Sequence, residues 1–197
     1  MLAGLGLAPL PERVVRDFIG QGIPSFVERS LAAAGPAAAG AQLEPALRAF
    51  GEHYRAFNGR SSRPFPGVVD GLRRLRAASL RLACVTNKAG AFTQPLLEKT
   101  GLVPLLDAVV TSDDVARRKP HPEPFMHACR LMAAAPSQAV VIGDSANDAE
   151  AGRAAGCRVF LVTYGYSEGR DVRELGADAV FDSIEAAVDA ALALMSR

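Results

Sequence analysis

The chain carries almost no net charge, and no part of it is apolar for long enough to cross a membrane. Its 22 basic and 21 acidic residues leave a formal charge of +1, which indicates neither a nucleic-acid-binding surface nor an acidic partner. A membrane span needs about 20 consecutive apolar residues, and no run approaches that length. Residues 1–11 lack the basic region and cleavage site of a signal peptide. We therefore expect no nucleic-acid partner and no membrane partner.

Cysteine is also scarce. Cys84, Cys129 and Cys157 are far apart and show no Cys-x-x-Cys spacing, which favours a reducing cytoplasm over an oxidising compartment. Cys84 lies inside an apolar run, so we interpret it as a small core residue rather than as a nucleophile. The expected location of the protein is cytoplasmic.

The apolar residues that are present suffice for one substantial core. The chain has 197 residues, of which 49% are hydrophobic, and this allows a core with a small accessory domain. Residues 1–63 show helical patterns and no convincing strand, so we expect a helical cap there. Residues 64–197 alternate between strands and helices, which predicts an α/β core with a Rossmann-like parallel sheet flanked by helices.

The expected elements follow from hydrophobic periodicity. Helices are expected at 12–18, 24–33, 43–57, 69–78 and 123–134, and in segments ending near 99, 155 and 195. Strands are expected at 80–85, 107–110, 139–142, 158–162 and 179–181. Pro95 predicts a kink or a late start in the helix that ends near residue 99.

The stretch from Ala139 to Gly152 is the most informative. The apolar residues 139–142 predict a buried strand, and Asp144 and Asp148 follow it directly. Acids at the carboxyl end of a parallel strand lie where open α/β sheets bind ligands, and their oxygens suit Mg²⁺. We expect Asp144 to bind the metal and Asp148 to bind it directly or through water. The alternative is that these polar residues cap the next helix.

Two further segments could contribute to the same site. Thr86 and Asn87 follow the strand at 80–85, and the hydroxyl and the amides of the next helix start could hold an anion. An ordinary strand-to-helix turn is the alternative. Lys119 precedes Pro120, which restricts the backbone and directs an ammonium that suits a phosphate. A basic surface loop is the alternative, and His121 and His127 have no partner at metal-ligand spacing.

In this order, the three segments resemble the motifs of the haloacid dehalogenase-like hydrolase superfamily. Val85-Thr86-Asn87 resembles its second motif, Lys119-Pro120 its third, and Gly143 to Asp148 its fourth. The resemblance covers about residues 64–182. Three further segments resemble the phosphoglycolate phosphatase-like branch, whose helical cap is inserted near the N-terminus: Gly20-Gln21-Gly22, Pro66-Gly67 and residues 165–169.

The first motif of that family, Asp-x-Asp-Gly-Thr, does not occur in the sequence. We expect the chain to begin inside the family pattern, downstream of the nucleophilic Asp, so that the first central strand is missing between the strands ending at Thr86 and Asp144. Each buried unsatisfied backbone group would cost about 1–3 kcal/mol. Either the two inner strands pair with each other, or another segment fills the gap, or the chain is poorly stable.

The resemblance implies a Mg²⁺-dependent phosphatase of a small phosphorylated metabolite, with phosphoglycolate preferred, acting through an aspartyl-phosphate. Lys119 would be catalytic, and it would bind phosphate together with Thr86 and Asn87. Gly20 and Gly22 would let the backbone approach the substrate, with a simple helix break as the alternative. Without the nucleophile, the chain is expected to be inactive. The alternatives are a catalytically silent phosphometabolite-binding protein and a sugar-phosphate mutase of the same fold. The sequence is compatible with a monomer or a homodimer.

Overall fold

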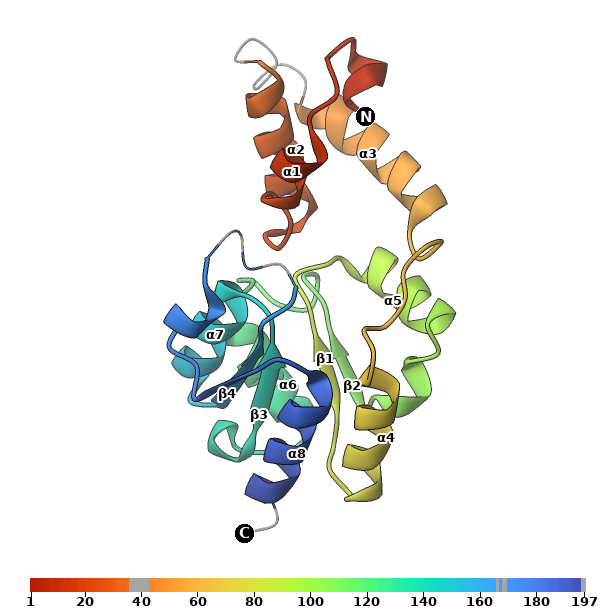
Figure 1. Cartoon of the computed structure of the whole chain (residues 1–197). Coiled ribbons are helices and arrows are strands. Elements are labelled where there is room, and N and C mark those ends of the chain that lie inside the picture. The colour runs from red at the N-terminus through yellow and green to blue at the C-terminus, as the bar shows by residue number, and fades with distance from the viewer. Residues whose placement is uncertain (36–42, 166, 168–169, 196–197) are drawn as a thin grey trace.

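Helices and parallel strands alternate through most of the chain (Figure 1). The computed structural model describes residues 1–35, 43–165, 167 and 170–195. The helices are α1 (Glu12–Arg16), α2 (Gly22–Ala34), α3 (Leu43–Phe57), α4 (Val68–Ala77), α5 (Gly90–Lys99), α6 (Glu123–Leu131), α7 (Ala146–Ala155) and α8 (Ile184–Met195). The strands are β1 (Ala83–Val85), β2 (Ala108–Val110), β3 (Val140–Gly143), β4 (Arg158–Val162) and β5 (Ala179–Phe181). Among these helices, none has both the length and the apolar character that a membrane crossing requires.

The strands form two separate parallel sheets. β1 pairs with β2, whereas β4 pairs with β3 on one side and with β5 on the other. The expected α/β architecture with parallel strands flanked by helices is confirmed. Within the described residues, no ladder joins β1 to β3 and no other strand lies between them. The two inner strands therefore neither pair with each other nor gain a substitute neighbour from the described part of the chain.

Two helical layers cover opposite faces of the three-stranded sheet. Side chains at alternate positions of a strand point to opposite faces. Val159 and Leu161 of β4 belong to the core formed with α6 and α7, whereas Phe160 packs with Leu75 of α4 and Val188 of α8. Figure 1 accordingly shows α8 in front of the strands and α6 behind them. The alternation in β4 thus builds two apolar cores, one on each side of the sheet.

The strands that border the gap are less buried than the sequence predicts. We predicted a buried strand at 139–142, but Val141 is buried there while Val140 and Ile142 are half-buried. All three residues of β1 are half-buried as well. By contrast, β4 has a neighbour on each side and is buried from Val159 to Val162. The difference arises because the gap leaves one edge of β1 and one edge of β3 uncovered.

Several boundaries differ from the predictions by a few residues, and the start of β1 has a local reason. β1 begins at Ala83 and not at residue 80, because the ladder with β2 starts there. One residue earlier, the N–H of Leu82 donates to the side chain of Asp107 (Oδ2, 2.8 Å), while the Leu82 carbonyl still accepts the Asp107 backbone N–H at 2.7 Å. Pro95 predicted a kink or a late start for the helix ending near residue 99, and the late start is wrong, because α5 begins at Gly90, before Pro95.

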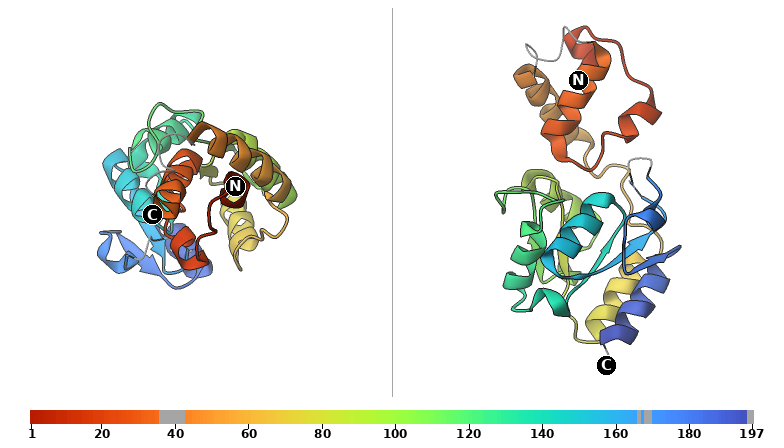
Figure 2. Two further views of the ribbon diagram at one scale, coloured as in Figure 1. Left: turned by 90° about the horizontal axis from the view of Figure 1, so that it is seen from above. Right: turned by 90° about the vertical axis from the view of Figure 1, so that its left-hand side faces the viewer.

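A helical part made by α1, α2 and α3 stands above the α/β part (Figure 2). Its apolar centre contains Val27, Leu31 and Ala46, which are fully buried. Partly buried side chains from residues 1–7 and from both long helices surround this centre. The helical character predicted for the start of the chain is therefore present. The domain division between residues 63 and 64 stays a prediction.

A small polar and aromatic cluster fixes the end of α3 to α5. The amide of Asn58 is buried and donates to the Phe92 carbonyl at 2.7 Å, and Lys99 Nζ donates to the Asn58 carbonyl at 2.9 Å. The rings of Tyr54 and Phe92 meet edge to face with their centroids 5.0 Å apart. Lys88 Nζ donates to the Tyr54 hydroxyl. These contacts hold the helical part at a defined place above the α/β part.

The core on β4 gives a direct test of the fold. Leu161 is fully buried at the centre of the three-stranded sheet, so Leu161→Ala is expected to lower the free energy of unfolding by about 2–5 kcal/mol. Leu131→Ala is the matched control, because Leu131 is 53% exposed and its loss should change stability by about 0.5 kcal/mol or less. Urea unfolding of both variants measures the difference. Equal losses would contradict the packing described here.

Candidate functional site

The carboxyl ends of β1 and β3 meet at one place beneath the helical part. Thr86 follows β1, and Asp144 follows β3. Lys119 reaches the same place from the loop between β2 and α6. Ligands bind outside the carboxyl ends of the strands in open α/β sheets. The three segments that the sequence analysis singled out therefore lie together, although the gap separates the strands that carry two of them.

Lys119 joins the two sides of the gap. Its Nζ donates to the Val85 carbonyl at the end of β1 at 2.8 Å and to Asp148 Oδ1 on α7 at 2.7 Å. The side chains of Lys119 and Asp148 are each only 10% exposed. An ammonium has three protons, so two of them are used by these partners and one remains for an anion. The lysine is thus fixed in place before any substrate binds.

Asp148 is held by more than its ion pair. Its Oδ2 accepts from the Ser145 hydroxyl at 2.6 Å and from the Asp144 N–H at 3.3 Å. Burial by itself would raise the pKa of the Asp148 carboxyl, but the charge of Lys119 and the hydrogen bonds from Lys119, Ser145 and Asp144 together lower the pKa. The carboxylate therefore stays charged. Ser145 also caps α7, because its hydroxyl accepts the Asp148 N–H, as the capping alternative predicted.

Asn87 connects three segments through its side-chain amide. Its Nδ2 donates to the Lys119 carbonyl at 2.9 Å and to the Gly20 carbonyl at 3.0 Å, and its Oδ1 accepts the Lys119 N–H at 3.0 Å. The amide thus fixes the backbone of Lys119 and the loop before α2. Because Nδ2 and Oδ1 of Asn87 are both bonded to protein groups, any contact between Asn87 and a phosphate would have to come from the Asn87 backbone.

The loop that carries Gly20 and Gly22 lies against the α/β part. Both glycines have positive φ values, 122° and 83°, which residues other than glycine rarely adopt. A Cβ atom at Gly22 would come within 2.7 Å of Arg118 Nη1. The glycines therefore let the helical part approach the loop that holds Lys119.

The backbone around Thr86 differs in part from the expected anion cradle. The Lys88 N–H donates to Thr86 Oγ1 at 3.2 Å, and the Gly90 N–H at the start of α5 donates to Asp113 Oδ2 at 2.7 Å. Two amides of the predicted cradle are therefore already satisfied. The Thr86 hydroxyl accepts a hydrogen bond, which leaves its own proton available to an anion.

Asp144 lies against the loop after β4. A Cβ atom at Gly165 would come within 2.0 Å of Asp144 Oδ2, so glycine is required for this close approach. Carboxylate oxygens at this place suit Mg²⁺. By the chemistry of its carboxylate, Asp144 fits a metal-binding role. Both oxygens of Asp148 are bonded to Lys119, Ser145 and the Asp144 N–H, which suits a role outside the direct metal ligands. Within the described residues, no group of three or more His, Cys, Asp or Glu side chains is arranged so that it could hold a metal ion.

The absence of a side chain at Gly143 also allows the first turn of α7 to lie close to the end of β3. A Cβ atom at Gly143 would lie 2.5 Å from the Asp148 Cβ. Gly143 belongs to a motif that is visible in the sequence, whereas the contacts of Gly165 with Asp144 and of Arg118 with Gly22 were not predicted. A glycine directly before an acidic residue, such as Gly143 before Asp144, can be recognised in the sequence. The contact between Gly165 and Asp144 joins two distant segments, so no local sequence pattern predicts it. Residues 166, 168 and 169 of the segment singled out at 165–169 lie outside the described residues.

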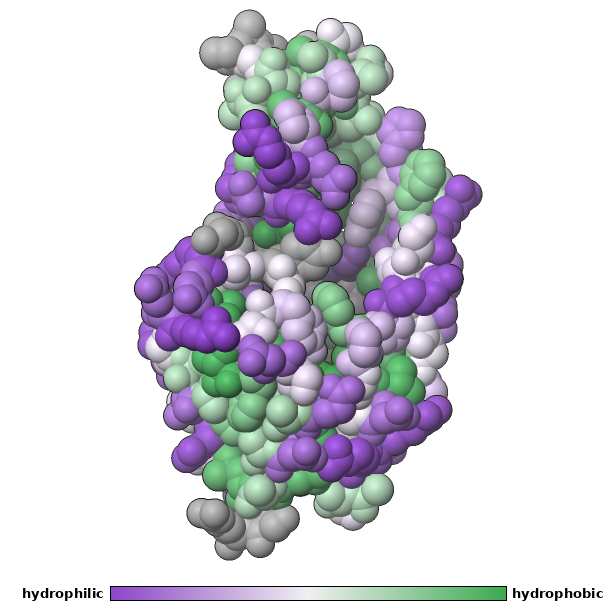
Figure 3. Space-filling view, viewed as in Figure 1, coloured by the Kyte–Doolittle hydropathy of each residue, from purple (hydrophilic) through white to green (hydrophobic). Residues whose placement is uncertain are grey.

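A polar cavity of about 410 Å³ adjoins Lys119. Gln21 contributes to it from the helical part, and Ser145, Asn147, Glu150 and Arg170 contribute from the α/β part. Figure 3 shows hydrophilic side chains gathered at the end of the helical part that faces the α/β part. The cavity thus lies between the helical part and the α/β part. It offers space for those groups of a small ligand that do not contact Lys119.

Cys84 does not act as a nucleophile in this arrangement. Burial raises the pKa of its thiol, and the nearby Lys119 charge opposes this without cancelling it. The thiol is therefore protonated at neutral pH, and a thiolate is the reactive form. His121 has a structural role, because its Nδ1 accepts the N–H of Glu123 near the start of α6 at 3.2 Å. The raised pKa of Cys84 agrees with the interpretation that it is not a nucleophile, but Cys84 is half-buried and not the core residue that the sequence predicted.

The buried ion pair makes a testable prediction. Lys119→Met leaves the Asp148 carboxylate buried without its cation, which should cost about 3–5 kcal/mol of stability. The double variant Lys119→Met/Asp148→Asn removes both charges and should recover a large part of that loss. Urea unfolding of the two single variants and the double variant gives the coupling between the side chains. Additive losses would show that the pair contributes nothing as a pair.

Comparison with known proteins supports the reading of the motifs. The family model described as haloacid dehalogenase-like hydrolase matches residues 3–156. A phosphoglycolate phosphatase from Cupriavidus necator is 47% identical over 94% of this chain and 80% of its own length. An N-acetylmuramic acid 6-phosphate phosphatase from Pseudomonas aeruginosa is 34% identical over 96% of this chain and 83% of its own.

A solved structure agrees with the fold as well. The crystal structure of a predicted phosphoglycolate phosphatase from Haemophilus somnus superposes with a TM-score of 0.91 and 30% identity. The match covers 96% of this chain and 86% of that one. The order of the motifs, the geometry at the strand ends and these similarities lead to the same conclusion. The chain belongs to the haloacid dehalogenase-like hydrolase family.

Proposed function

We propose that this chain carries the phosphate site and the metal site of a Mg²⁺-dependent phosphatase of a small phosphorylated metabolite, with phosphoglycolate as the preferred substrate, but without the nucleophile motif of that family. The observation that carries the proposal is the position of Lys119. Its ammonium is held between the Val85 carbonyl and Asp148 at the carboxyl ends of the strands, which is where a phosphoryl group would need a fixed positive charge.

The residues around Lys119 would bind the phosphoryl group in defined roles. The remaining proton of Lys119 would go to one phosphoryl oxygen, and the Thr86 hydroxyl would donate to another. Asn87 would act as a positioning residue, because its amide holds the backbone of Lys119. The arrangement exists before substrate binds, so no rearrangement is needed as charge develops.

Asp144 would bind the magnesium ion directly. Asp148 would lie outside the set of direct metal ligands. When bound, Mg²⁺ supplies positive charge that offsets the charge of the phosphoryl oxygens. Gly165 keeps the loop after β4 close to Asp144, and it would thereby limit the directions from which the carboxylate can bind. The donor chemistry of Asp144 supports this assignment.

The proposed chemistry is attack by an aspartate carboxylate on phosphorus, which displaces the alcohol oxygen of the substrate and forms an aspartyl-phosphate. Water then cleaves this intermediate and restores the carboxylate. The Asp-x-Asp-Gly-Thr motif that supplies this aspartate in the family is absent from the 197 residues. The chain therefore carries the groups that bind and neutralise phosphate, without the nucleophile.

The choice of substrate rests on the relatives and on the polar cavity. The Cupriavidus necator relative is a phosphoglycolate phosphatase, and the cavity of about 410 Å³ beside Lys119 is polar and lies under Gln21 of the helical part. Such a cavity suits a small charged metabolite. The Pseudomonas aeruginosa relative acts on a larger sugar phosphate by its name, which makes that compound the natural competitor in a substrate test.

A second candidate function is binding of a phosphometabolite without turnover. The absence of the nucleophile motif favours it. The two candidates share the phosphate site and differ in whether any phosphate is released. A cytoplasmic location and a monomeric or homodimeric state remain predictions from the sequence.

The 197-residue chain is expected to release no phosphate from phosphoglycolate above background, even with Mg²⁺. The reason is that the 197 residues contain no Asp-x-Asp-Gly-Thr motif, and among the described residues no strand lies between β1 and β3. A phosphate-release assay with purified protein measures this, and omission of Mg²⁺ provides the background. Robust Mg²⁺-dependent release would mean that another residue acts as nucleophile and that the proposed chemistry is wrong.

Binding should depend on Thr86. A hydrogen bond to a charged group contributes about 1.5–3 kcal/mol, so Thr86→Ala should weaken phosphoglycolate binding by about tenfold or more. Thr100→Ala is the matched control, because the Thr100 hydroxyl bonds to the Leu96 carbonyl at the end of α5. Calorimetric titrations with Mg²⁺, and with N-acetylmuramic acid 6-phosphate as competitor, measure both variants. Unchanged affinity in Thr86→Ala would overturn the phosphate assignment.

A further inference from the structure

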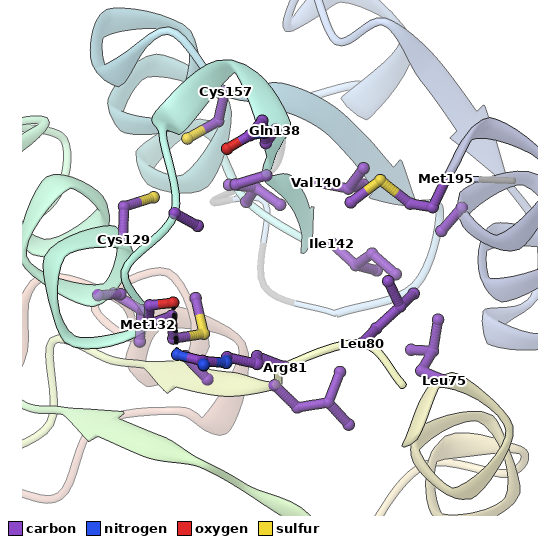
Figure 4. A pocket seen from close by; sticks show the side chains of 18 of the residues that line it. Leu75, Leu80, Arg81, Cys129, Met132, Gln138, Val140, Ile142, Cys157 and Met195 are labelled. Carbon is purple, nitrogen blue, oxygen red and sulfur yellow. Dashed lines mark hydrogen bonds between the residues drawn. The ribbon is translucent and has the colours of Figure 1, made fainter. Parts of the chain in front are cut away.

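Two of the three cysteines face each other in the core that α6 and α7 form on β4. Cys129 lies near the end of α6 and is 3% exposed, and Cys157 follows the end of α7 and is 7% exposed. Figure 4 shows their sulfur atoms directed toward each other. Both side chains belong to the same apolar core. The proposed function assigns no role to this pair of nucleophilic groups.

The two thiols interact with each other. Burial raises the pKa of Cys129, and a hydrogen bond that the Cys157 thiol donates to Cys129 opposes this rise. Burial also raises the pKa of Cys157, and with the proximity of Cys129 this pKa reaches about 12. Cys129 is thus the thiol of the pair that ionises first. Since the thiolate is the reactive form, Cys129 is the nucleophile of the pair and Cys157 its partner.

The backbone holds both cysteines in place. The Cys157 N–H donates to the Gly152 carbonyl at 2.9 Å, and Gly156 ends α7 in the left-handed conformation with a φ of 82°. Cys129 lies within α6, and its carbonyl accepts the Ala134 N–H at 3.0 Å. The helices α6 and α7 pack on each other. Two cysteines on a fixed backbone can be bridged only when their side chains point toward each other, and this pair meets that condition.

We infer that Cys129 and Cys157 are an oxidation site, at which hydrogen peroxide converts the two thiols into a reversible disulfide. The Cys129 thiolate attacks one oxygen of the peroxide, the O–O bond breaks, and one water and a sulfenic acid form. The Cys157 thiol then attacks the Cys129 sulfur, so that the S–S bond forms and a second water leaves. The two thiols lose two electrons and two protons, and the peroxide is reduced to two molecules of water.

The bridge would close a loop of the chain that contains the acids of the candidate site. Asp144 and Asp148 both lie between Cys129 and Cys157 in the sequence, on the segment that forms β3 and α7. A disulfide stabilises the folded state mainly because it restricts the unfolded chain. Oxidation would therefore protect this segment against unfolding. The inference goes beyond the proposed function, because it depends on thiol chemistry and not on phosphate binding.

Oxidation of the native protein tests the inference. Hydrogen peroxide should lower the number of free thiols from three to one. Mass spectrometry of a non-reducing tryptic digest should find the peptides of Cys129 and Cys157 linked, and dithiothreitol should restore all three thiols. Cys84→Ser is the matched control, because Cys84 lies outside the pair, and this variant should form the same link. The assay uses no Mg²⁺ and no phosphate, so its failure is separate from failure of the phosphatase proposal.

Thermal unfolding measures the consequence of the bridge. The oxidised wild-type protein should unfold about 5 °C or more above the reduced protein, because a disulfide typically contributes about 2–4 kcal/mol and each kcal/mol shifts the midpoint by about 2–4 °C in a chain of this size. Hydrogen exchange of the amides in 140–149 should slow in the oxidised form. Cys157→Ala treated with peroxide should show neither change, and circular dichroism confirms that this variant is folded.

Several outcomes would overturn the inference. Oxidation of the thiols to sulfinic acids without a link would do so, and so would links that include Cys84 as often as the pair. A link between Cys129 and Cys157 that forms in urea and not in the native protein would assign it to the unfolded chain. An unchanged midpoint in the linked protein would contradict the stabilising effect. These measurements on the wild-type protein decide the question even if Cys157→Ala does not fold.

Discussion

One buried lysine connects the two halves of this molecule at the place where chemistry is expected. Lys119 donates to the last carbonyl of β1 and to a carboxylate at the start of α7, which follows β3. No backbone ladder crosses between these strands in the described residues. The relative position of the two strand ends therefore depends strongly on a single side chain and on the amide of Asn87, which orients its backbone.

Much of the architecture could be predicted from the sequence because its signals are local. The alternation of apolar runs with helical patterns gave β4, β5 and α3 with the boundaries that the structure shows. The spacing of Thr86, Lys119 and Asp144 with respect to the strand ends indicated a common site. In a parallel sheet, side chains that follow the strands necessarily lie at one edge, so their proximity does not require knowledge of the packing.

The remainder depends on contacts between distant segments. An apolar run predicts burial on the assumption that both neighbouring strands are present, and this assumption fails for Val140, Ile142 and β1. The amide of Asn87 reaches Gly20 and Lys119 across the fold, and no sequence pattern distinguishes this role from an ordinary turn. The close approach of Gly165 to Asp144 is likewise visible only in three dimensions.

The division of the strands into two sheets has a consequence for how the molecule opens. Cooperative units follow continuous hydrogen-bonded and packed networks. Among the described residues the hydrogen-bonded ladder is interrupted between β1 and β3, and the two sheets are joined by the packing of α4 on α8 and of α6 on α7. We therefore expect the amides of the two-stranded sheet β1–β2 and those of the three-stranded sheet β3–β4–β5 to differ in their protection from hydrogen exchange. The two-stranded sheet, with three residues in each of its strands, should unfold first under mild denaturant, while the three-stranded sheet keeps its buried central strand β4.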